Sequence, residues 1–439
     1  MALEPRNATS STGSDHQLGG AMASRILVSA YACEPGKGSE PGVGWNWALT
    51  LARSGHKVWV LTRKNNALTV DPELSRLDSA IRSNLEFIYY DLPKWARWWK
   101  KGGRGVRLYY LFWQWGAYLK ARRLHARVGF DRVHHATFVS VRQPSFMGGL
   151  GIPFVFGPVG GGEHAPWSLR RDFGLRGWLL DGVRDLANAL VQWDPMMWRT
   201  FRQAERIYVT SEQSRALVPA RYRHKTEVRL AIGIEGEPQH DALAADVPAA
   251  PRFLYLGRFL YWKGMHLGMR AFAAYLKRTP SARLSMIGTG PDELRLRRLA
   301  HELGIEASVD WSPWVRQAEL GDVYRAHHAL LFPSLHDSGG MVALEALQHG
   351  LPVVCLKLGG PGVIVDDTCG VAVDAEGGGR QALVSRLATA LHTVTDPAND
   401  LARMRAGARA RAGAFSWDAL VASVYGATHA TVGTPGGRM

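Results

Sequence analysis

Short apolar runs alternate along the chain with stretches of helical periodicity, and glycine-rich loops separate them. In the first half, residues 25–31 (RILVSAY) are predominantly apolar, residues 43–53 have helical spacing, and residues 57–62 (KVWVLT) form another apolar run. This strand–helix–strand order predicts a βαβ unit, whose crossover requires a parallel sheet. Later strands are predicted at Glu86–Tyr90, Arg132–His135, Pro153–Phe156 and Arg206–Thr210.

The periodicity stops at residues 236–251, where Pro, Ala and acidic residues accumulate, and this segment is predicted to be an interdomain linker. A second alternating series follows it. Its strands are predicted at Arg252–Leu256, Arg283–Ile287, Val309–Trp311, Ala329–Phe332 and Pro352–Leu356, with helices at Asp292–Leu303 and Met341–His349. The pattern therefore indicates two α/β domains, in which ligands collect at the carboxyl ends of the strands.

Length and composition agree with two globular domains. A chain of 439 residues exceeds the usual single core, and its 46 % hydrophobic share and 48 glycines are typical of α/β proteins. Cys33, Cys355 and Cys369 lack metal-type spacing and indicate reduced, cytosolic thiols. No apolar run of 18 residues predicts a membrane span, and residues 1–21 lack the apolar core of a signal peptide, which makes Met22 an alternative start.

The net charge of +15 calls for an anionic partner. The segment Lys94–Arg123 holds nine Lys or Arg, five Trp and no acid, a composition that suits an anionic membrane surface. A solvated basic helix whose aromatic residues pack inward is the alternative. Nucleic acid is a third interpretation, and it ranks last because no nucleic-acid module motif accompanies the patch.

The most informative chemistry lies in residues 331–354, where a buried strand, a polar turn, a short helix and another strand follow one another. Asp337 and Glu345 lie eight residues apart around this turn. Gly340 has no side chain, so a ligand can approach the backbone, and the helix that begins near Met341 directs its unpaired N–H groups at the same point. Such a site suits a nucleoside-diphosphate sugar, with amides for the phosphates and carboxylates for the hydroxyls.

These residues resemble the signature of retaining glycosyltransferases of family 4, which have the two-domain GT-B fold. The resemblance rests on Asp337-(x)7-Glu345, on the following Ala-x-x-x-Gly-x-Pro-Val, and on Gly257-Arg-(x)4-Lys-Gly264. The family more often has Glu at the first acidic position and Pro-Phe in place of Ser338-Gly339, a departure that bears on the donor sugar. The resemblance implies that amides of Met341 and Val342 cradle the pyrophosphate. It also implies that Glu345 holds the ribose and Asp337 the sugar hydroxyls.

Two cations follow the first strand of the second domain. Arg258 and Lys263 are expected at the interdomain cleft, where they would stabilise the charge that builds on the leaving diphosphate. A surface loop is the alternative for either residue alone. Downstream, Gly290 belongs to a Gly-x-Gly-Pro loop that resembles the family's nucleotide loop, although many strand–helix turns look the same.

The first domain offers weaker candidates. Gly42 and Gly44 open a helix and are candidates for holding a phosphate, or else form only a tight strand–helix turn, and Glu40 beside them is a candidate for hydroxyl contacts. The family carries a His near the strand end at His134-His135 that touches the donor sugar, and His135 is preferred here. A purely structural role is the alternative for such a His.

One further loop is a candidate for sugar binding. It ends in Gly160-Gly161-Gly162-Glu163, where a glycine cluster would admit a sugar and the carboxylate of Glu163 would bind its hydroxyls. No cluster has metal-ligand spacing and no Asp-x-Asp is suited to a metal-held diphosphate, so neither a metal nor another cofactor is expected.

The resemblance implies a retaining hexosyltransferase that uses a UDP- or GDP-sugar and a glycan or polyprenyl-diphosphate-linked acceptor, in bacterial exopolysaccharide or O-antigen synthesis. We expect it at the inner face of the cytoplasmic membrane. A sugar-nucleotide epimerase of the same fold and a non-catalytic basic scaffold remain alternatives. The expected division is a disordered tail (1–21), an acceptor-side domain (22–240), a nucleotide-sugar domain (241–415), a helix crossing back (416–430) and a flexible tail (431–439).

Overall fold

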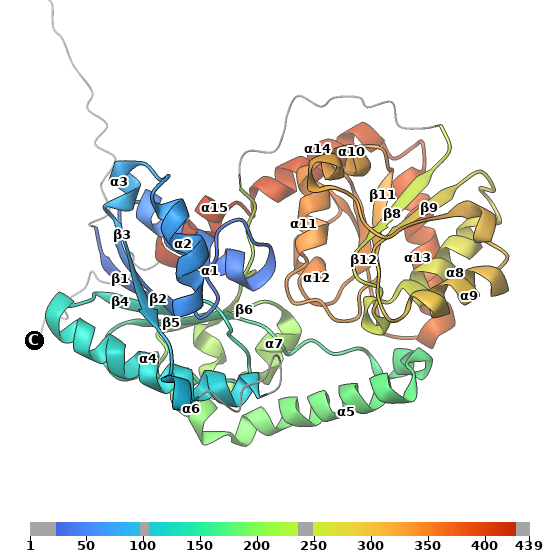
Figure 1. The fold of residues 1–439 in the computed structure, drawn as a ribbon. Helices are drawn as coiled ribbons and strands as arrows, with labels where there is room; N and C mark the ends of the chain where they lie inside the picture. The colour runs from blue at the N-terminus through green and yellow to red at the C-terminus, as the bar shows by residue number, and fades with distance from the viewer. Residues whose placement is uncertain (1–22, 97–104, 236–248, 427–439) are drawn as a thin grey trace, which may run out of the picture.

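The computed structural model describes residues 23–96, 105–235 and 249–426 (Figure 1). The two predicted tails and most of the predicted linker lie outside these ranges. Within them the chain forms two α/β lobes, each built around its own parallel sheet.

The first domain contains a parallel sheet of seven strands in the order β3-β2-β1-β4-β5-β6-β7. The strands are β1 (Arg25–Ser29), β2 (Lys57–Arg63), β3 (Leu85–Tyr90), β4 (Arg132–His135), β5 (Phe154–Val159), β6 (Arg206–Val209) and β7 (Thr226–Val228). The strand order reverses between β1 and β4, so the loops that follow these two strands open a crevice at the carboxyl edge of the sheet.

The second domain repeats this plan with six parallel strands in the order β10-β9-β8-β11-β12-β13. They are β8 (Arg252–Leu256), β9 (Arg283–Ile287), β10 (Val309–Ser312), β11 (Ala329–Phe332), β12 (Val353–Leu356) and β13 (Gly370–Val373). The order reverses between β8 and β11. The predicted class, two doubly wound domains, is confirmed. The edge strands β7 and β13 were not predicted, because they are only three and four residues long.

Helices cover both sheets. In the first domain they are α1 (Ser39–Arg53), α2 (Ala67–Leu74), α3 (Ser79–Arg82), α4 (Val106–Val128), α5 (Leu175–Leu190), α6 (Pro195–Gln203) and α7 (Glu212–Leu217). In the second they are α8 (Met265–Leu276), α9 (Glu293–Glu302), α10 (Leu320–Arg325), α11 (Met341–Gln348), α12 (Pro361–Ile364), α13 (Gly379–Thr395) and α14 (Leu401–Gly413). Helix α1 begins before the predicted Val43, because Pro41 falls in its first turn and costs no hydrogen bond there.

The last helix, α15 (Trp417–Tyr425), returns from the second domain and packs against α1 of the first (Figure 1). The Trp417 and Trp47 rings meet edge to face at 6.2 Å between centroids. Tyr425 lies 3.0 Å from Nδ1 of the buried His134. The end of the described chain is therefore tied into the core of the first domain.

The basic, Trp-rich segment is described only in part, because residues 97–104 lie outside the described ranges. Within α4, Tyr109, Tyr110 and Trp113 are buried, as the inward-packing interpretation predicts. Trp95, by contrast, is 78 % exposed and Trp115 is 48 % exposed. None of the described helices is long and apolar enough to cross a bilayer.

Candidate functional site

The polar turn between β11 and α11 is organised by Asp337. Its Oδ1 accepts hydrogen bonds from the amides of Gly339 at 3.1 Å and Gly340 at 2.7 Å. Gly340 has φ +72°, and a Cβ there would lie 2.8 Å from Ile364 and 3.0 Å from the backbone of Pro361. Only glycine suits this position, and it lets α11 start directly behind the turn. The first amides of α11, from Met341 onward, have no partner within the helix.

Lys263 meets this turn from the neighbouring strand. The short helical turn Tyr261–Lys263 follows β8, and β8 and β11 are adjacent in the sheet. Nζ of Lys263 lies 2.5 Å from Oδ2 of Asp337, and both side chains are less than 20 % exposed. The ammonium also lies 4.9 Å from the centre of the Phe332 ring. A paired cation and the amino end of a helix are thus brought together, which suits an anionic ligand.

A cavity of about 570 Å³ joins this turn to the first domain. The second domain contributes Lys263 and residues 337–342. The first domain contributes polar and small residues from several strand ends, among them Glu40, Ser140, Gly160, Gly161 and Thr210. Glu40 accepts a hydrogen bond from the Phe138 amide at 2.8 Å, and burial raises the pKa of its carboxyl.

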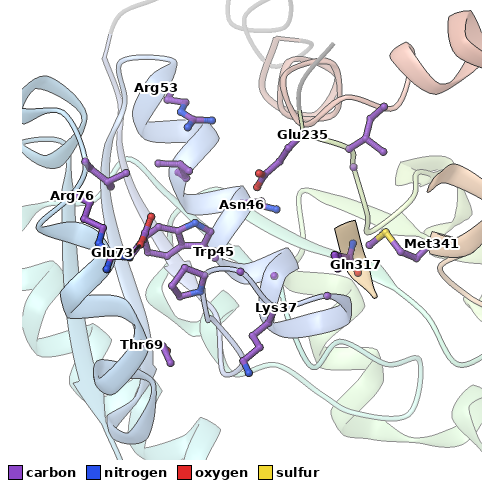
Figure 2. Close-up of a pocket in the computed structure, with 18 of the residues that line it drawn as sticks. Lys37, Trp45, Asn46, Arg53, Thr69, Glu73, Arg76, Glu235, Gln317 and Met341 are labelled. Carbon is purple, nitrogen blue, oxygen red and sulfur yellow. Dashed lines mark hydrogen bonds and ion pairs between the residues drawn. The ribbon is translucent and has the colours of Figure 1, made fainter. Parts of the chain in front are cut away.

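A second cavity, of about 850 Å³, lies on the other side of Met341, which lines both. Figure 2 shows Lys37, Trp45 and Asn46 on its first-domain side, and Gln317 and Met341 facing them from the second domain. Glu345 also lines this cavity and accepts a hydrogen bond from Tyr324 at 3.2 Å. Burial raises the pKa of its carboxyl. The two cavities form a crevice between the domains that is large enough for a nucleotide sugar.

Of the two predicted cations, the structure brings only Lys263 to the turn. Arg258 is exposed and lines neither cavity, and its backbone carbonyl accepts a hydrogen bond from Tyr255 at 2.9 Å. The loop after β8 turns the side chain of Arg258 outward, while the Gly264 turn packs against the Pro333 carbonyl and directs Lys263 inward. The expected convergence of both cations is therefore not found in this arrangement.

His135 does not reach the crevice. It is 1 % exposed, lies 2.8 Å from the Tyr110 hydroxyl, and packs against the Phe156 ring. Its neighbour His134 lies 2.7 Å from the Gly157 carbonyl. Burial lowers the pKa of His134 to about 4 and of His135 to about 3. In this structure His135 occupies a structural position on β4, a central strand covered on both faces, and its contact with a donor sugar stays a prediction.

Glu163 is also structural. It is 5 % exposed, and its carboxylate accepts hydrogen bonds from the Gly161 amide and from the hydroxyls of Thr210, Ser211 and Ser214. These donors fix the glycine loop after β5 to the loop after β6. Gly161 lines the smaller cavity, whereas Glu163 does not, and the binding of sugar hydroxyls by Glu163 stays a prediction.

Three predicted glycines serve close packing. A Cβ at Gly44 would lie 2.2 Å from the Ala32 carbonyl, and one at Gly290 would lie 2.3 Å from the Phe259 carbonyl, and neither lines a cavity. These contacts account for glycine at both positions, and the predicted phosphate contacts stay predictions. Gly42 lines the larger cavity, although a Cβ there would lie 2.0 Å from the Lys37 carbonyl.

Some residues of the crevice were not predicted. Lys37 precedes the glycines that were singled out, and Asn46 lies on α1 one turn after Gly42. A lysine in a glycine-rich loop before a helix is a signal that could have drawn attention to the first of them. Among the described residues, no group of three or more His, Cys, Asp and Glu is arranged to hold a metal ion.

Comparison with known proteins begins with the second domain. Residues 246–411 match the family model of glycosyl transferases group 1. A D-inositol 3-phosphate glycosyltransferase of Segniliparus rotundus is 34 % identical over 178 residues, which cover 39 % of this chain and 38 % of that protein. The matched part thus spans less than half of the length of such curated relatives.

Solved structures extend the likeness to both domains. Sucrose-phosphate synthase from Thermosynechococcus elongatus superposes with a TM-score of 0.59 at 18 % identity, over 93 % of this chain and 98 % of that one. Anabaena Alr3699/HepE in complex with UDP and glucose gives 0.53 at 15 % identity, over 93 % and 100 %. The fold is GT-B.

Proposed function

We propose that this protein is a nucleotide-sugar-dependent glycosyltransferase that moves a hexose to a glycan or lipid-linked acceptor with retention of configuration. The observation that carries the proposal is the meeting of Lys263, Asp337 and the amino end of α11 at one interdomain cavity. The group 1 family match over the same domain supports it.

The reaction breaks the bond between the sugar and the diphosphate, so negative charge builds on the leaving diphosphate. Lys263 would neutralise this charge, and amides of Met341 and Val342 would donate hydrogen bonds to the phosphate oxygens, since all three residues line the smaller cavity. These groups supply positive charge without a metal ion, and we propose that none is required. A front-face route assisted by the leaving phosphate would retain the configuration.

We assign the donor's remaining parts to the two cavities. Glu345 lines the larger one, where its carboxyl would accept hydrogen bonds from the ribose hydroxyls. Asp337 lines the smaller one beside Glu40 and Gly161, and we place the hexose there. Because Asp337 already binds two amides and Lys263, it would hold the lysine in position as well as contact the sugar.

Nucleotide binding tests the proposal. We expect isothermal titration to show binding of UDP or GDP, and Lys263→Ala to weaken it by roughly 100-fold, the scale of losing one preorganised charged contact. Lys277→Ala is the matched control, because Lys277 is an exposed lysine at the end of α8 in the same domain. Equal nucleotide affinity in the wild type and Lys263→Ala, with folding verified by circular dichroism, would refute the assignment.

Product analysis then defines the reaction. The nucleotide sugar that stabilises the protein most is incubated with lipid-linked oligosaccharide from membrane extracts and, in parallel, with D-inositol 3-phosphate, the compound named for the curated relatives. A mass increase of one hexose in an acceptor supports transfer. Isomerisation of the donor sugar in the absence of any acceptor would instead identify an epimerase.

The acceptor is proposed to lie at the inner face of the cytoplasmic membrane, in the assembly of a bacterial surface polysaccharide. The basic segment Lys94–Arg123, with exposed Trp95 and Trp115, supports contact with anionic lipid.

A further inference from the structure

Helix α5 turns its apolar side away from the protein. Leu175 is 86 % exposed and Leu186 is 62 % exposed, and the row continues into the following turn with Trp193 at 68 %. At 100° per residue Leu175 and Leu186 fall on the same side of the helix. The other exposed large apolar residues between these ends are Trp178, Leu179, Leu180, Val183 and Leu190. We call Leu175–Trp193 the α5 ridge.

The opposite side of α5 is polar and faces the protein. Asp181 is 1 % exposed, and its carboxylate lies 3.0 Å from Nε2 of His336 and accepts a hydrogen bond from the Tyr261 hydroxyl at 3.1 Å. Asp185 forms an ion pair with the buried Arg170 at 2.5 Å. Since these partners fix the rotation of the helix, the apolar side cannot turn inward. Within the described residues nothing covers it.

Most of the exposed charges around the α5 ridge are positive, and the partly exposed Asp194 that follows it caps helix α6. Asp181 and Asp185 are the only acids between Leu175 and Trp193, and both are held on the inner side. Four exposed arginines flank the ridge, at positions Arg171, Arg176, Arg199 and Arg202. A row of Leu with Trp near both ends and a cationic border is complementary to an anionic bilayer surface, where rings lie among the headgroups and arginines bind lipid phosphates.

The ridge is also continuous with other lipid-compatible surface. Contacts link α5 through its terminal turn to α6, and α6 through residues 147–150 to α4. Figure 1 shows α4, α6 and α5 following one another along the same side of the molecule, with α5 reaching beneath the second domain. Helix α4 exposes Leu108, Phe112 and Trp115.

We propose that the α5 ridge inserts into the headgroup region of an anionic lipid bilayer and is the principal apolar anchor of this protein. The inference rests on the proposed function only for its purpose, which is to bring a lipid-linked acceptor to the crevice. The contacts show how the two are related, because Tyr261 and His336, which bind Asp181 of α5, adjoin Lys263 and Asp337 at the site.

Vesicle co-sedimentation of the full-length chain tests the proposal. We compare vesicles of phosphatidylcholine alone with vesicles of phosphatidylcholine and phosphatidylglycerol in equal parts, each at low and at high salt. The wild type is expected to bind the anionic vesicles at least about tenfold more tightly, and less so at high salt. The double variant Leu179→Ser, Leu186→Ser should weaken this binding about tenfold or more, because two leucines no longer enter the lipid.

Leu294→Ser is the matched control. Leu294 is 76 % exposed on α9 of the second domain, so the same substitution removes an equally exposed leucine away from the ridge. Binding should stay within about twofold of the wild type, since the control site makes no lipid contact. Arg171→Glu with Arg176→Glu should weaken binding chiefly at low salt, which separates the electrostatic part from the apolar part.

Each contrary outcome has a defined meaning. Vesicle binding that survives in the leucine double variant would overturn the assignment to α5 and leave Lys94–Arg123 as the attachment. The wild type could instead fail to bind vesicles and form a dimer in sedimentation equilibrium, while the double variant is monomeric. That result would assign the ridge to a second copy of the chain and overturn the proposal. UDP and GDP titration of the same preparations keeps the two hypotheses apart: nucleotide binding without vesicle binding refutes only this inference, and the reverse refutes only the proposed function.

Discussion

The two adjacent buried histidines should make the first domain sensitive to mild acid. His134 lies between the Gly157 carbonyl and the Tyr425 hydroxyl, and Nε2 of His135 lies 2.8 Å from the Tyr110 hydroxyl. Burial depresses the pKa of His134 to about 4 and of His135 to about 3. In the unfolded chain both pKa values return to about 6.5.

The folded and unfolded pKa values determine how the free energy of unfolding changes with pH. Above about pH 6.5 both residues are neutral in either state, and their contribution to stability is fully present. As the pH falls below that point, the histidines bind protons in the unfolded chain but not in the folded chain. The free energy of unfolding therefore decreases until the pH nears the pKa values of the folded state. Between pH 7 and pH 5 the loss amounts to about 2 kcal/mol for each histidine, since each pKa unit is worth about 1.4 kcal/mol.

Urea unfolding at pH 7 and pH 5, followed by circular dichroism, measures this loss. His134→Asn can keep an acceptor for Tyr425 but cannot be protonated, so the variant should lose about 2 kcal/mol less than the wild type between the two pH values. His224→Asn, the same substitution at an exposed position, should behave as the wild type does. An equal pH dependence in the wild type and His134→Asn would refute the reasoning.

Three further substitutions probe the turn, the glycine loop and the domain contact. Gly340→Ala should lower the melting temperature and nucleotide affinity, because a side chain at φ +72° costs about 1–2 kcal/mol and would also meet the backbone of Pro361. Gly377→Ala, with φ +76° and open space around it, should cost only the backbone term, and equal melting temperatures would contradict the clash. Glu163→Gln should destabilise by about 1–3 kcal/mol with nucleotide affinity unchanged, and the reverse result would return Glu163 to the ligand site. Asp181→Ala should cost about 3–5 kcal/mol in urea unfolding, because it leaves Arg184 and His336 without their carboxylate, whereas Asp322→Ala at an exposed ion pair should cost under about 1 kcal/mol.

The fold was largely predictable because most of the apolar runs are strands whose residues are buried on both faces. The same burial limits what residue spacing can say about side-chain direction. A strand in a parallel sheet has no solvent face, so the position of His135 at a strand end could not show whether the ring points to a ligand or into the core. The hydrogen bonds of Glu163 could not be predicted because its hydroxyl donors lie about 50 residues further along the chain, at the end of β6 and the start of α7.

The candidate site was predictable where it depends on adjacent strand ends. Lys263 and Asp337 each follow a strand, and their meeting requires only that these strands be neighbours in the sheet. The outward direction of Arg258 depends on the conformation of a single loop, which residue spacing does not specify. The exposure of the α5 ridge could not be predicted from the sequence either, because an apolar row on a helix ordinarily faces the core. In α5 the buried Asp181 faces the protein instead, and the apolar row faces outward.

The pairing of Lys263 with Asp337 has a consequence for how a donor would bind. A mostly buried ammonium has lost much of its hydration, so it needs an anion nearby to remain charged. Asp337 supplies that anion, with Oδ2 at 2.5 Å from Nζ. A diphosphate carries more negative charge than one carboxylate and is also attracted by the unpaired amides at the start of α11. Donor binding would therefore draw Lys263 from Asp337 towards the phosphates. The released Oδ2 would then accept a hydrogen bond from the sugar, while Oδ1 stays bound to the Gly339 and Gly340 amides and keeps the turn intact. In this proposed scheme one carboxyl would serve both roles in turn, so the turn would need no second lysine.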